Sequence, residues 1–293
     1  MATITKRGNF QWQAKVRKKG QPVVSKTFDS KAQAEKWARL IESEMDMGVF
    51  VSRTEAESTT LHEALDRYLR EITPHKKGAK PETDRIRAWQ RHPLAKRFMA
   101  AIRSVDLANY RDDRLAEGKS ASTVRNEINI ISHLFNIARK EWGMESLSNP
   151  IENIRRPSVP KGRERRLVDD EEKKLIENSS APLNEIIIIA LETGMRRGEI
   201  LNMEWSNIDL NKRLLVLADT KNGDARVVPL STKSIKVLTT MPRNISGRVF
   251  TEICGDSVSR RFRELCKRLE IEGLRFHDLR HEATSRFVDN GVT

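Results

Sequence analysis

Four side chains in the second half of the chain could together act on a phosphate group. They are Arg196, Lys221, His277 and Arg280. Two planar guanidinium groups can grip phosphate oxygens through paired hydrogen bonds and stabilise the charge that builds up on phosphorus in a transition state. A lysine and a histidine can transfer the protons that such a reaction needs. The set predicts phosphate chemistry without a metal, although each residue taken singly is more simply explained by a structural role.

The local sequence places both arginines near the start of helices. An apolar run over 183–193 predicts a helix that Gly194 ends, and Arg196 then opens the next helix. A last helix is expected to carry His277 and Arg280. Its buried face is expected to hold Leu279, Ala283 and Phe287, because these residues are spaced four apart.

A β-hairpin is expected to carry Lys221. Strands are predicted over 214–218 and 225–229, and Asn222-Gly223 between them is a dipeptide typical of tight hairpin turns. A long side chain at such a turn can reach a ligand. A further helix is predicted over 257–269.

The net charge of +13 is unevenly distributed along the 293 residues. Residues 1–50 carry 10 Lys or Arg against 5 Asp or Glu, and residues 155–166 carry 6 against 1, whereas residues 167–293 carry 20 of each. A positive excess concentrated in an N-terminal module and a linker could neutralise phosphates. With a pI of about 9.9, this favours a nucleic-acid partner. A membrane surface is not expected, because no amphipathic Lys-rich helix with aromatic residues is visible.

Residues 1–50 are expected to form a small basic β-module. Residues 1–29 predict a three-stranded sheet, and a helix capped by Asp29 or Ser30 follows. A sheet of this kind can enter the major groove of DNA. The basic residues expected to contact DNA are Lys15, Arg17, Lys19 and Lys26, which could equally form an ordinary solvated face.

Residues 59–148 are expected to form a bundle of about four helices, after a linker over 48–58. The longest helix is predicted over 120–142, where apolar residues recur at helical spacing. A loop is predicted over 75–81, before a helix over 83–91. Small polar and basic residues at the start of the longest helix could seat a phosphate, namely Ser120, Thr123 and Arg125.

Residues 149–166 contain three prolines and predict an extended, flexible connector. Arg155, Arg156 and Arg163 within it are expected to contact DNA. A second globular unit, over 167–293, is expected to follow.

The order of the motifs resembles the active-site signature of the tyrosine recombinase, or phage integrase, family. The sequence Thr193-Gly194-Met195-Arg196-Arg197-Gly198-Glu199 comes first, a hairpin lysine ahead of Val228-Pro229-Leu230 follows, and His277-Asp278-Leu279-Arg280-His281 comes last. The β-module and the bundle resemble the arm-type and core-type DNA-binding domains of phage and prophage integrases. The resemblance covers nearly the whole chain. It implies a mainly α fold with small β elements, ending in a mixed α/β catalytic domain of tyrosine recombinase type.

The resemblance also implies a mechanism and a role for each residue. In this family a tyrosine attacks the scissile phosphate, forming a 3′-phosphotyrosyl link and releasing a 5′-hydroxyl. Arg196 and Arg280 would clamp the non-bridging oxygens, and Lys221 would protonate the leaving 5′-oxygen. His277 would assist proton transfer, and Glu199 would brace the site. Neither a metal nor another cofactor is implied.

The implied partner is duplex DNA at attachment sites, bound by a homotetramer, with possible DNA-bending or excision accessory proteins. A bacterial or phage-encoded protein in the cytoplasm, associated with the nucleoid, is expected. Residues 1–10 lack the apolar core of a secretory signal, and the longest apolar run, 186–191, is too short for a membrane span. Cys254 and Cys266 provide no disulfide framework and no zinc spacing.

The position of the tyrosines departs from the family pattern. The sequence contains Tyr68 and Tyr110, both in the predicted bundle, whereas the family places its nucleophile beyond the His-x-x-Arg motif. Only 13 residues follow Arg280. We therefore expect a chain truncated before its nucleophile and inactive alone, or one whose tyrosine comes from another subunit.

Two other functions are compatible with the sequence. A non-catalytic DNA-binding remnant would occupy integrase sites without cutting them. A metal-dependent nuclease could use His277 and His281, which are four residues apart and could share a metal on one helix face.

Overall fold

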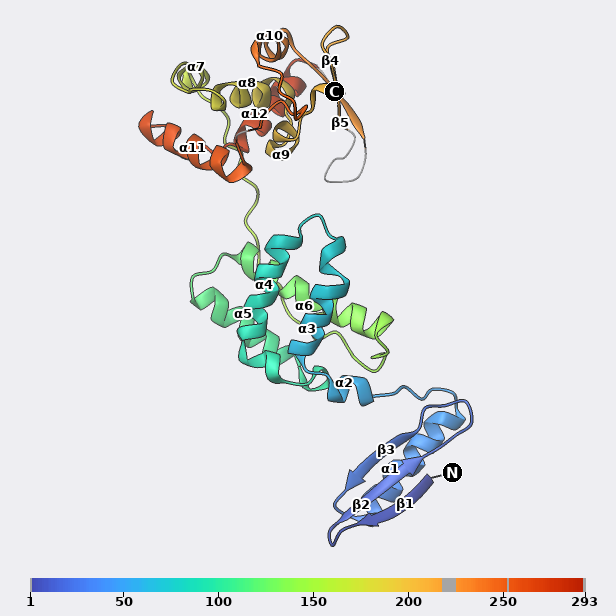
Figure 1. Ribbon diagram of the computed structural model, residues 1–293. Coiled ribbons are helices and arrows are strands. Elements are labelled where there is room, and N and C mark those ends of the chain that lie inside the picture. Colours follow the sequence, from blue (N-terminus) through green and yellow to red (C-terminus); the bar gives the residue numbers. More distant parts are fainter. Residues whose placement is uncertain (1, 218–224, 252, 292–293) are drawn as a thin grey trace. The chain divides into compact units, whose positions relative to one another are not determined.

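The computed structural model describes residues 2–217, 225–251 and 253–291. It divides the chain into two compact units, Met1–Pro160 and Lys161–Thr293 (Figure 1). Helices predominate in both, and each contains a three-stranded antiparallel sheet, which confirms the expected fold class. Among the described residues, no helix combines the length and apolar character that crossing a membrane requires.

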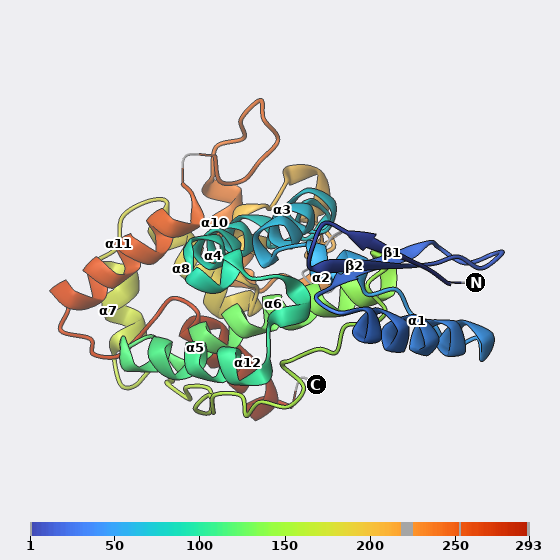
Figure 2. The ribbon, with the colours of Figure 1, turned by 90° about the horizontal axis from the view of Figure 1, so that it is seen from below.

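The first unit begins with the expected β-module. Strands β1 (Ala2–Arg7), β2 (Gln11–Val16) and β3 (Val24–Phe28) pair in chain order, and helix α1 (Lys31–Asp46) lies along one face of the sheet (Figure 2). Ser30 caps α1, because its Oγ accepts a hydrogen bond from the N–H of Gln33 at 3.3 Å. The apolar residues between sheet and helix are Ala14, Val16, Ala34, Ala38, Ile41 and Met45.

The strand register separates the basic residues of this module. Cross-strand partners lie on the same face of a sheet. Lys26 is the partner of Ala14, which is fully buried, whereas Lys15 pairs with Ser25 and points to the opposite face. Lys19 lies in the turn after β2. Lys15 and Lys26 therefore do not share one face, which the alternation of the sequence alone did not reveal.

Five α-helices of the first unit follow the β-module. They are α2 (Thr54–Ser58), α3 (Leu61–Glu71), α4 (Ala79–Arg91), α5 (Ser104–Ala116) and α6 (Ala121–Glu141). Two loop predictions are corrected. The linker over 48–58 contains α2, and α4 begins at Ala79 although Pro81 follows, because a proline in the first turn costs no helical hydrogen bond.

Both tyrosines are packing residues of this helical bundle. Tyr110 stacks on Trp89 with 3.8 Å between ring centroids, and its hydroxyl donates to Glu127 at 2.8 Å. Tyr68 is fully buried, and its hydroxyl lies 2.6 Å from Nδ1 of His133. Burial raises the pKa of both phenols.

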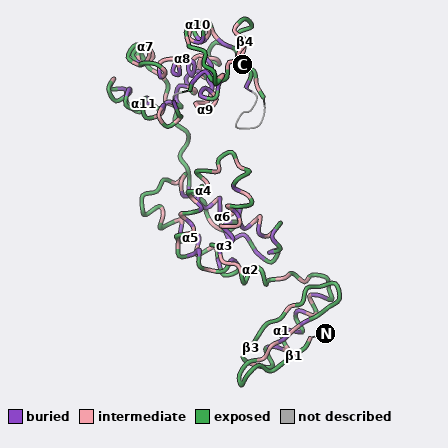
Figure 3. The backbone as a smooth tube through the Cα atoms, in the orientation of Figure 1, coloured by how far each residue is buried: buried purple, intermediate pink, exposed green. Residues whose placement is uncertain are grey.

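The predicted connector is ordered at both of its ends. Ile151 is buried against the bundle, and the side-chain amide of Asn149 donates to the Ser132 carbonyl at 3.1 Å. Residues 155–162 are exposed except for Pro157 and form neither helix nor strand (Figure 3). Residues 163–167 bond to the second unit, as described below.

The second unit contains a small sheet among helices. Its helices are α7 (Glu171–Glu177), α8 (Leu183–Thr193), α9 (Arg197–Leu201), α10 (Thr232–Thr240), α11 (Gly255–Arg268) and α12 (Asp278–Asp289). Its strands β4 (Ile208–Asp209), β5 (Leu214–Leu217) and β6 (Arg226–Pro229) pair in chain order. The middle of helix α8, residues 186–191, is apolar, which suits its packing against both α10 and α12. Leu279 and Ala283 of α12 are fully buried, as expected, whereas Phe287 is half-buried.

Candidate functional site

Arg196 and Glu199 form a compact unit at the start of α9. The Glu199 carboxylate accepts one hydrogen bond from the Arg196 backbone N–H and another from its guanidinium, both at 2.8 Å. This arrangement caps the helix and fixes the arginine side chain at the same time. The Glu199 side chain is 8% exposed and that of Arg196 is 34% exposed, so the pair lies at the wall of the site.

Arg226 is a third member that the sequence analysis did not identify. It lies at the start of β6, and its Nη2 donates to Glu199 at 2.7 Å. Burial raises the pKa of Glu199, but the Arg196 hydrogen bonds and the charges of both arginines outweigh it, so the net shift is downward. The carboxylate therefore ties the start of β6 to α9.

Gly194 brings Arg280 to this site across 86 residues of sequence. Gly194 ends α8 with a φ of +61°, a conformation that favours glycine. Its carbonyl accepts a short hydrogen bond from Nη1 of Arg280, and a Cβ at this position would lie 3.4 Å from the Phe287 ring. The turn that leads into Arg196 is therefore packed directly against α12.

The described residues of the site carry more positive than negative charge. Burial lowers the pKa of Arg280, and the charges of Arg196 and Arg226 lower it further. Glu199 is the carboxylate that offsets them. Among the described residues, these three guanidinium groups and one carboxylate leave a positive charge that an anion can neutralise.

A groove of about 900 Å³ opens beside Arg196. Basic side chains dominate its polar lining, namely Arg196, Arg197, Arg263, Arg275 and His277. Arg197 is anchored there by a short hydrogen bond to Ser259, and its guanidinium packs so closely on Gly255 that a Cβ would lie 2.9 Å from it. The groove is therefore a strongly basic surface that includes Arg196.

His277 lies at the N-terminal end of α12 and is exposed in the groove. Partial burial of the ring lowers the pKa of His277, and the neighbouring His281 and Arg280 lower it further, which favours the neutral ring. A neutral imidazole can accept a proton.

The His277 and His281 rings are 5.2 Å apart, and the described residues contain no group of three or more potential metal ligands.

Lys221 and the Asn222-Gly223 turn lie outside the described residues. The described strands on either side, β5 and β6, pair with Leu217 opposite Arg226. Lys221 therefore remains a prediction.

The residues expected to contact DNA occupy different settings. Arg125, Arg155 and Arg156 are exposed. The Ser120 hydroxyl caps α6 by accepting the N–H of Thr123 at 3.2 Å. Arg163 is paired with Asp278, at 3.3 Å, in the second unit.

Sequence reasoning missed Arg226, Arg263 and Arg275 as members of the site. Arg226 follows the hairpin turn and Arg275 precedes His277 by two residues, so proximity to the recognised motifs was the available signal. Arg263 lies on α11 and carried no signal of its own.

Comparison with known proteins gives consistent matches. The model of the Phage integrase family matches residues 165–293. A putative integrase/recombinase of Haemophilus influenzae is 35% identical over 99% of this chain and 81% of its own length. The shufflon-specific DNA recombinase of Escherichia coli is 45% identical over 79% of this chain, and the match spans 62% of that protein.

Solved structures share the fold. The Tn1549 transposon integrase, in complex with circular intermediate DNA, gives a TM-score of 0.66 at 17% identity and covers 80% of this chain and 89% of that one. A lambda integrase tetramer bound to a Holliday junction gives 0.64 at 22% identity, covering 97% and 90%. At these identities the likeness establishes the fold alone.

Proposed function

The chain belongs to the phage integrase family of tyrosine recombinases, and from this we propose that it acts in site-specific recombination of duplex DNA. Cleavage and rejoining would proceed through a 3′-phosphotyrosyl intermediate. The link preserves the energy of the phosphodiester bond, so neither ATP nor a metal is required.

The proposed roles rest on the family membership, and the geometry of the described residues supports those of Arg196, Glu199 and Arg280. Arg196 and Arg280 bind the non-bridging oxygens of the scissile phosphate, with Glu199 holding Arg196 in place. His277, exposed in the basic groove, takes part in proton transfer, and Lys221 donates a proton to the leaving 5′-oxygen. The single observation that carries the proposal is the cluster of Arg196, Arg226 and Arg280 around one carboxylate, since its surplus charge suits a phosphate.

The proposed nucleophile is neither Tyr68 nor Tyr110. Both are packed in the helical bundle of the first unit, and the raised pKa of each phenol opposes formation of the attacking phenolate. Cleavage is therefore tested with a tyrosine supplied to the site and, for comparison, without one. The two sources to compare are a tyrosine-bearing segment joined after residue 293 and the same segment added as a separate peptide.

The test is covalent capture on nicked duplexes from the shufflon, the DNA named in the 45%-identical relative. The chain joined to a tyrosine-bearing segment should accumulate a protein–DNA adduct. Arg196→Ala or Arg280→Ala should lower the cleavage rate about 10²–10³-fold, as when one preorganised donor is removed from a transition state. Lys221→Ala should slow cleavage, and a 5′-thio leaving group should suppress that defect, because a thiolate departs without an acid.

DNA binding without any adduct, in a chain supplied with tyrosine, would instead favour a DNA-binding protein that does not cut. Adduct formation that depends on added divalent metal would favour the nuclease alternative. We further propose a cytoplasmic, nucleoid-associated protein that assembles as a homotetramer on two duplexes.

A further inference from the structure

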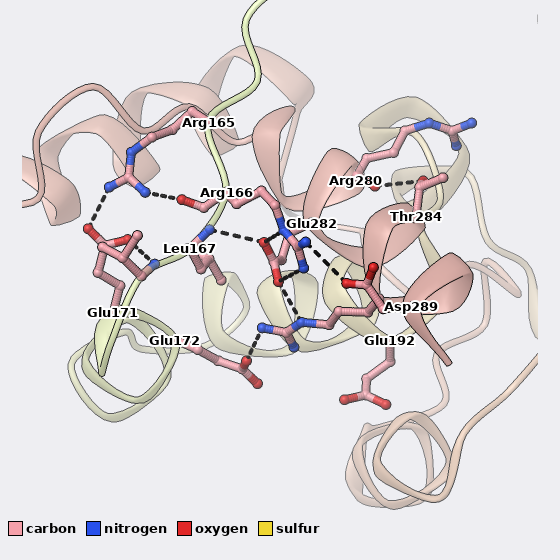
Figure 4. A network of polar contacts seen from close by, with 12 residues as sticks. Arg165, Arg166, Leu167, Glu171, Glu172, Glu192, Arg280, Glu282, Thr284 and Asp289 are labelled. Carbon is pink, nitrogen blue, oxygen red and sulfur yellow. Dashed lines mark hydrogen bonds and ion pairs between the residues drawn. The ribbon is translucent and has the colours of Figure 1, made fainter. Parts of the chain in front are cut away.

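Residues 163–167, which we call the strap, run along α12 and bond to it at three levels. Arg163 pairs with Asp278 at 3.3 Å, at the beginning of the helix. Arg166 pairs with Glu282 at 3.2 Å in its middle and with Asp289 at 3.1 Å near its end (Figure 4). Basic residues that the sequence assigns to a DNA-binding linker are thus bonded within the second unit.

Glu282 is the centre of these contacts. Its side chain is 4% exposed, and its carboxylate accepts hydrogen bonds from the Leu167 N–H at 3.0 Å, from Arg166 and from Arg286 at 2.7 Å. Arg286 also pairs with Glu172 of α7 at 2.7 Å. Burial raises the pKa of Glu282, but these donors outweigh it and the net shift is downward. The carboxylate is therefore held ionised and fully hydrogen-bonded.

These pairs are not readily exchanged for DNA phosphates. Asp278 and Glu282 are both buried, and an arginine that left either one for a phosphate would leave a buried carboxylate short of a partner. Arg155 and Arg156 are both exposed, so their side chains can contact a phosphate without leaving a buried carboxylate unpaired. The basic residues of the linker thus fall into a DNA-accessible group and a group bound to α12.

The helix held by the strap carries the site. Arg280 lies two residues before Glu282, on a different side of α12. The guanidinium of Arg280 reaches the Gly194 carbonyl, and its own carbonyl accepts the Thr284 hydroxyl at 2.8 Å. Core packing of Leu279 and Ala283 resists separation of α12 from α8, but apolar contacts are non-directional and fix its rotation and axial position less tightly.

We propose that Arg166 and Glu282 are a positioning pair, which sets the rotation of α12 and thereby aims Arg280 at the phosphate. Neither residue touches DNA in this scheme. The inference rests on the proposed function, because it assumes that Arg280 binds a phosphate oxygen.

The test uses the full chain labelled with ¹³C and ¹⁵N at arginine, and inorganic phosphate as the probe. The Nε–Hε resonance of Arg280 is assigned by its loss in Arg280→Lys and is followed during a phosphate titration. Arg166→Gln and Glu282→Gln should each weaken the phosphate affinity read at Arg280 by about tenfold, the order seen when a residue that orients a metal ligand is removed. Arg166→Lys, which keeps the charge but not the planar fork, should recover part of the loss. Lys173→Gln, which removes an exposed pair with Glu177, is the matched control and should change nothing.

A second measurement separates positioning from DNA contact. In binding to a non-specific duplex, Arg156→Gln should reduce the dependence of log K on log salt by about one unit, whereas Arg166→Gln should leave the slope unchanged. A reduced slope for Arg166→Gln would mean that the strap binds DNA and would overturn the inference.

The outcomes of the titration also distinguish the two proposals. A wild-type Arg280 that responds to phosphate, with the same affinity in Arg166→Gln, refutes the positioning pair and leaves the proposed function intact. A wild-type Arg280 that does not respond at all refutes the phosphate clamp and the inference with it. Should Arg166→Gln fail to fold, Arg166→Lys decides, since wild-type affinity in that variant would show that the paired geometry is unnecessary.

Discussion

Replacing Glu199 with Gln should destabilise the second unit and make its stability depend on anions. The variant retains one amide oxygen for the Arg196 N–H, but it removes the negative charge shared by Arg196 and Arg226. Arg280 loses its nearby carboxylate as well. The structure therefore predicts a stability loss caused by three like charges, and not by a lost cap alone.

The magnitude follows from the exposure of the partners. Removing one member of a fully buried ion pair costs about 3–5 kcal/mol, and an exposed pair is worth about 0–1 kcal/mol. The Glu199 side chain is 8% exposed, whereas those of Arg196 and Arg226 are 34% and 37% exposed, so solvent screens part of the repulsion. We expect a loss of about 1–3 kcal/mol, between these two limits.

The assay is native-state hydrogen exchange at the amides of α8, because a chain of two units need not unfold in one transition. Sulfate should restore stability more to Glu199→Gln than to wild type. At about ten times its dissociation constant, an anion bound only by the folded state adds about 1.4 kcal/mol. The control is Glu177→Gln, whose carboxylate lies 3.9 Å from Lys173 on the exposed surface of α7.

Two results would refute this reasoning. The first is a stability change in Glu199→Gln no larger than that of Glu177→Gln. The second is an equal effect of sulfate on variant and wild type, which would show that the three guanidinium groups do not create an anion site.

Three further predictions test other parts of the structure. Gly194→Ala should lower the stability of the second unit by about 1–2 kcal/mol, because a φ of +61° is strained for a residue that carries a Cβ; an unchanged thermal midpoint would contradict this. In a thiol titration Cys254 should react quickly, because it is exposed and hydrogen bonds from Ser257 lower its pKa. Cys266 should react only on unfolding, because burial raises its pKa to about 11; two equally fast thiols would contradict this. Deleting residues 1–50 should reduce the salt dependence of DNA binding, and an affinity that is flat with salt in the full chain would contradict the electrostatic interpretation.

Local patterns were sufficient to predict most of the elements. Alternation predicted β2, the apolar run predicted α8, and the glycine at 194 predicted its end, because each of these signals acts within a few residues of backbone. Elements whose formation depends on packing against other parts of the chain could not be predicted from local patterns. The segment over 48–58 lacked periodicity yet contains α2, and residues 149–154 appeared to be linker although Ile151 is buried.

The site shows the same division. The residue types of Arg196, His277 and Arg280 indicated phosphate chemistry, because a guanidinium donates to phosphate oxygens and an imidazole can transfer a proton. The order of the motifs that contain them indicated the family. That Arg226 joins Glu199, and that Arg280 reaches Gly194, required the tertiary structure, since these contacts cross 27 and 86 residues.

The sequence alone could not determine which basic side chains of the linker are free to bind a phosphate. The sequence determined that the linker is basic, and so that it could bind phosphates. Only the fold decided which of its arginines are already paired, because Asp278, Glu282 and Asp289 lie more than 100 residues away along the chain. A buried carboxylate retains its arginine partner because an unpaired charge in the protein interior is strongly destabilising. In the unfolded chain the carboxylate is solvated, so this constraint arises only when the chain folds.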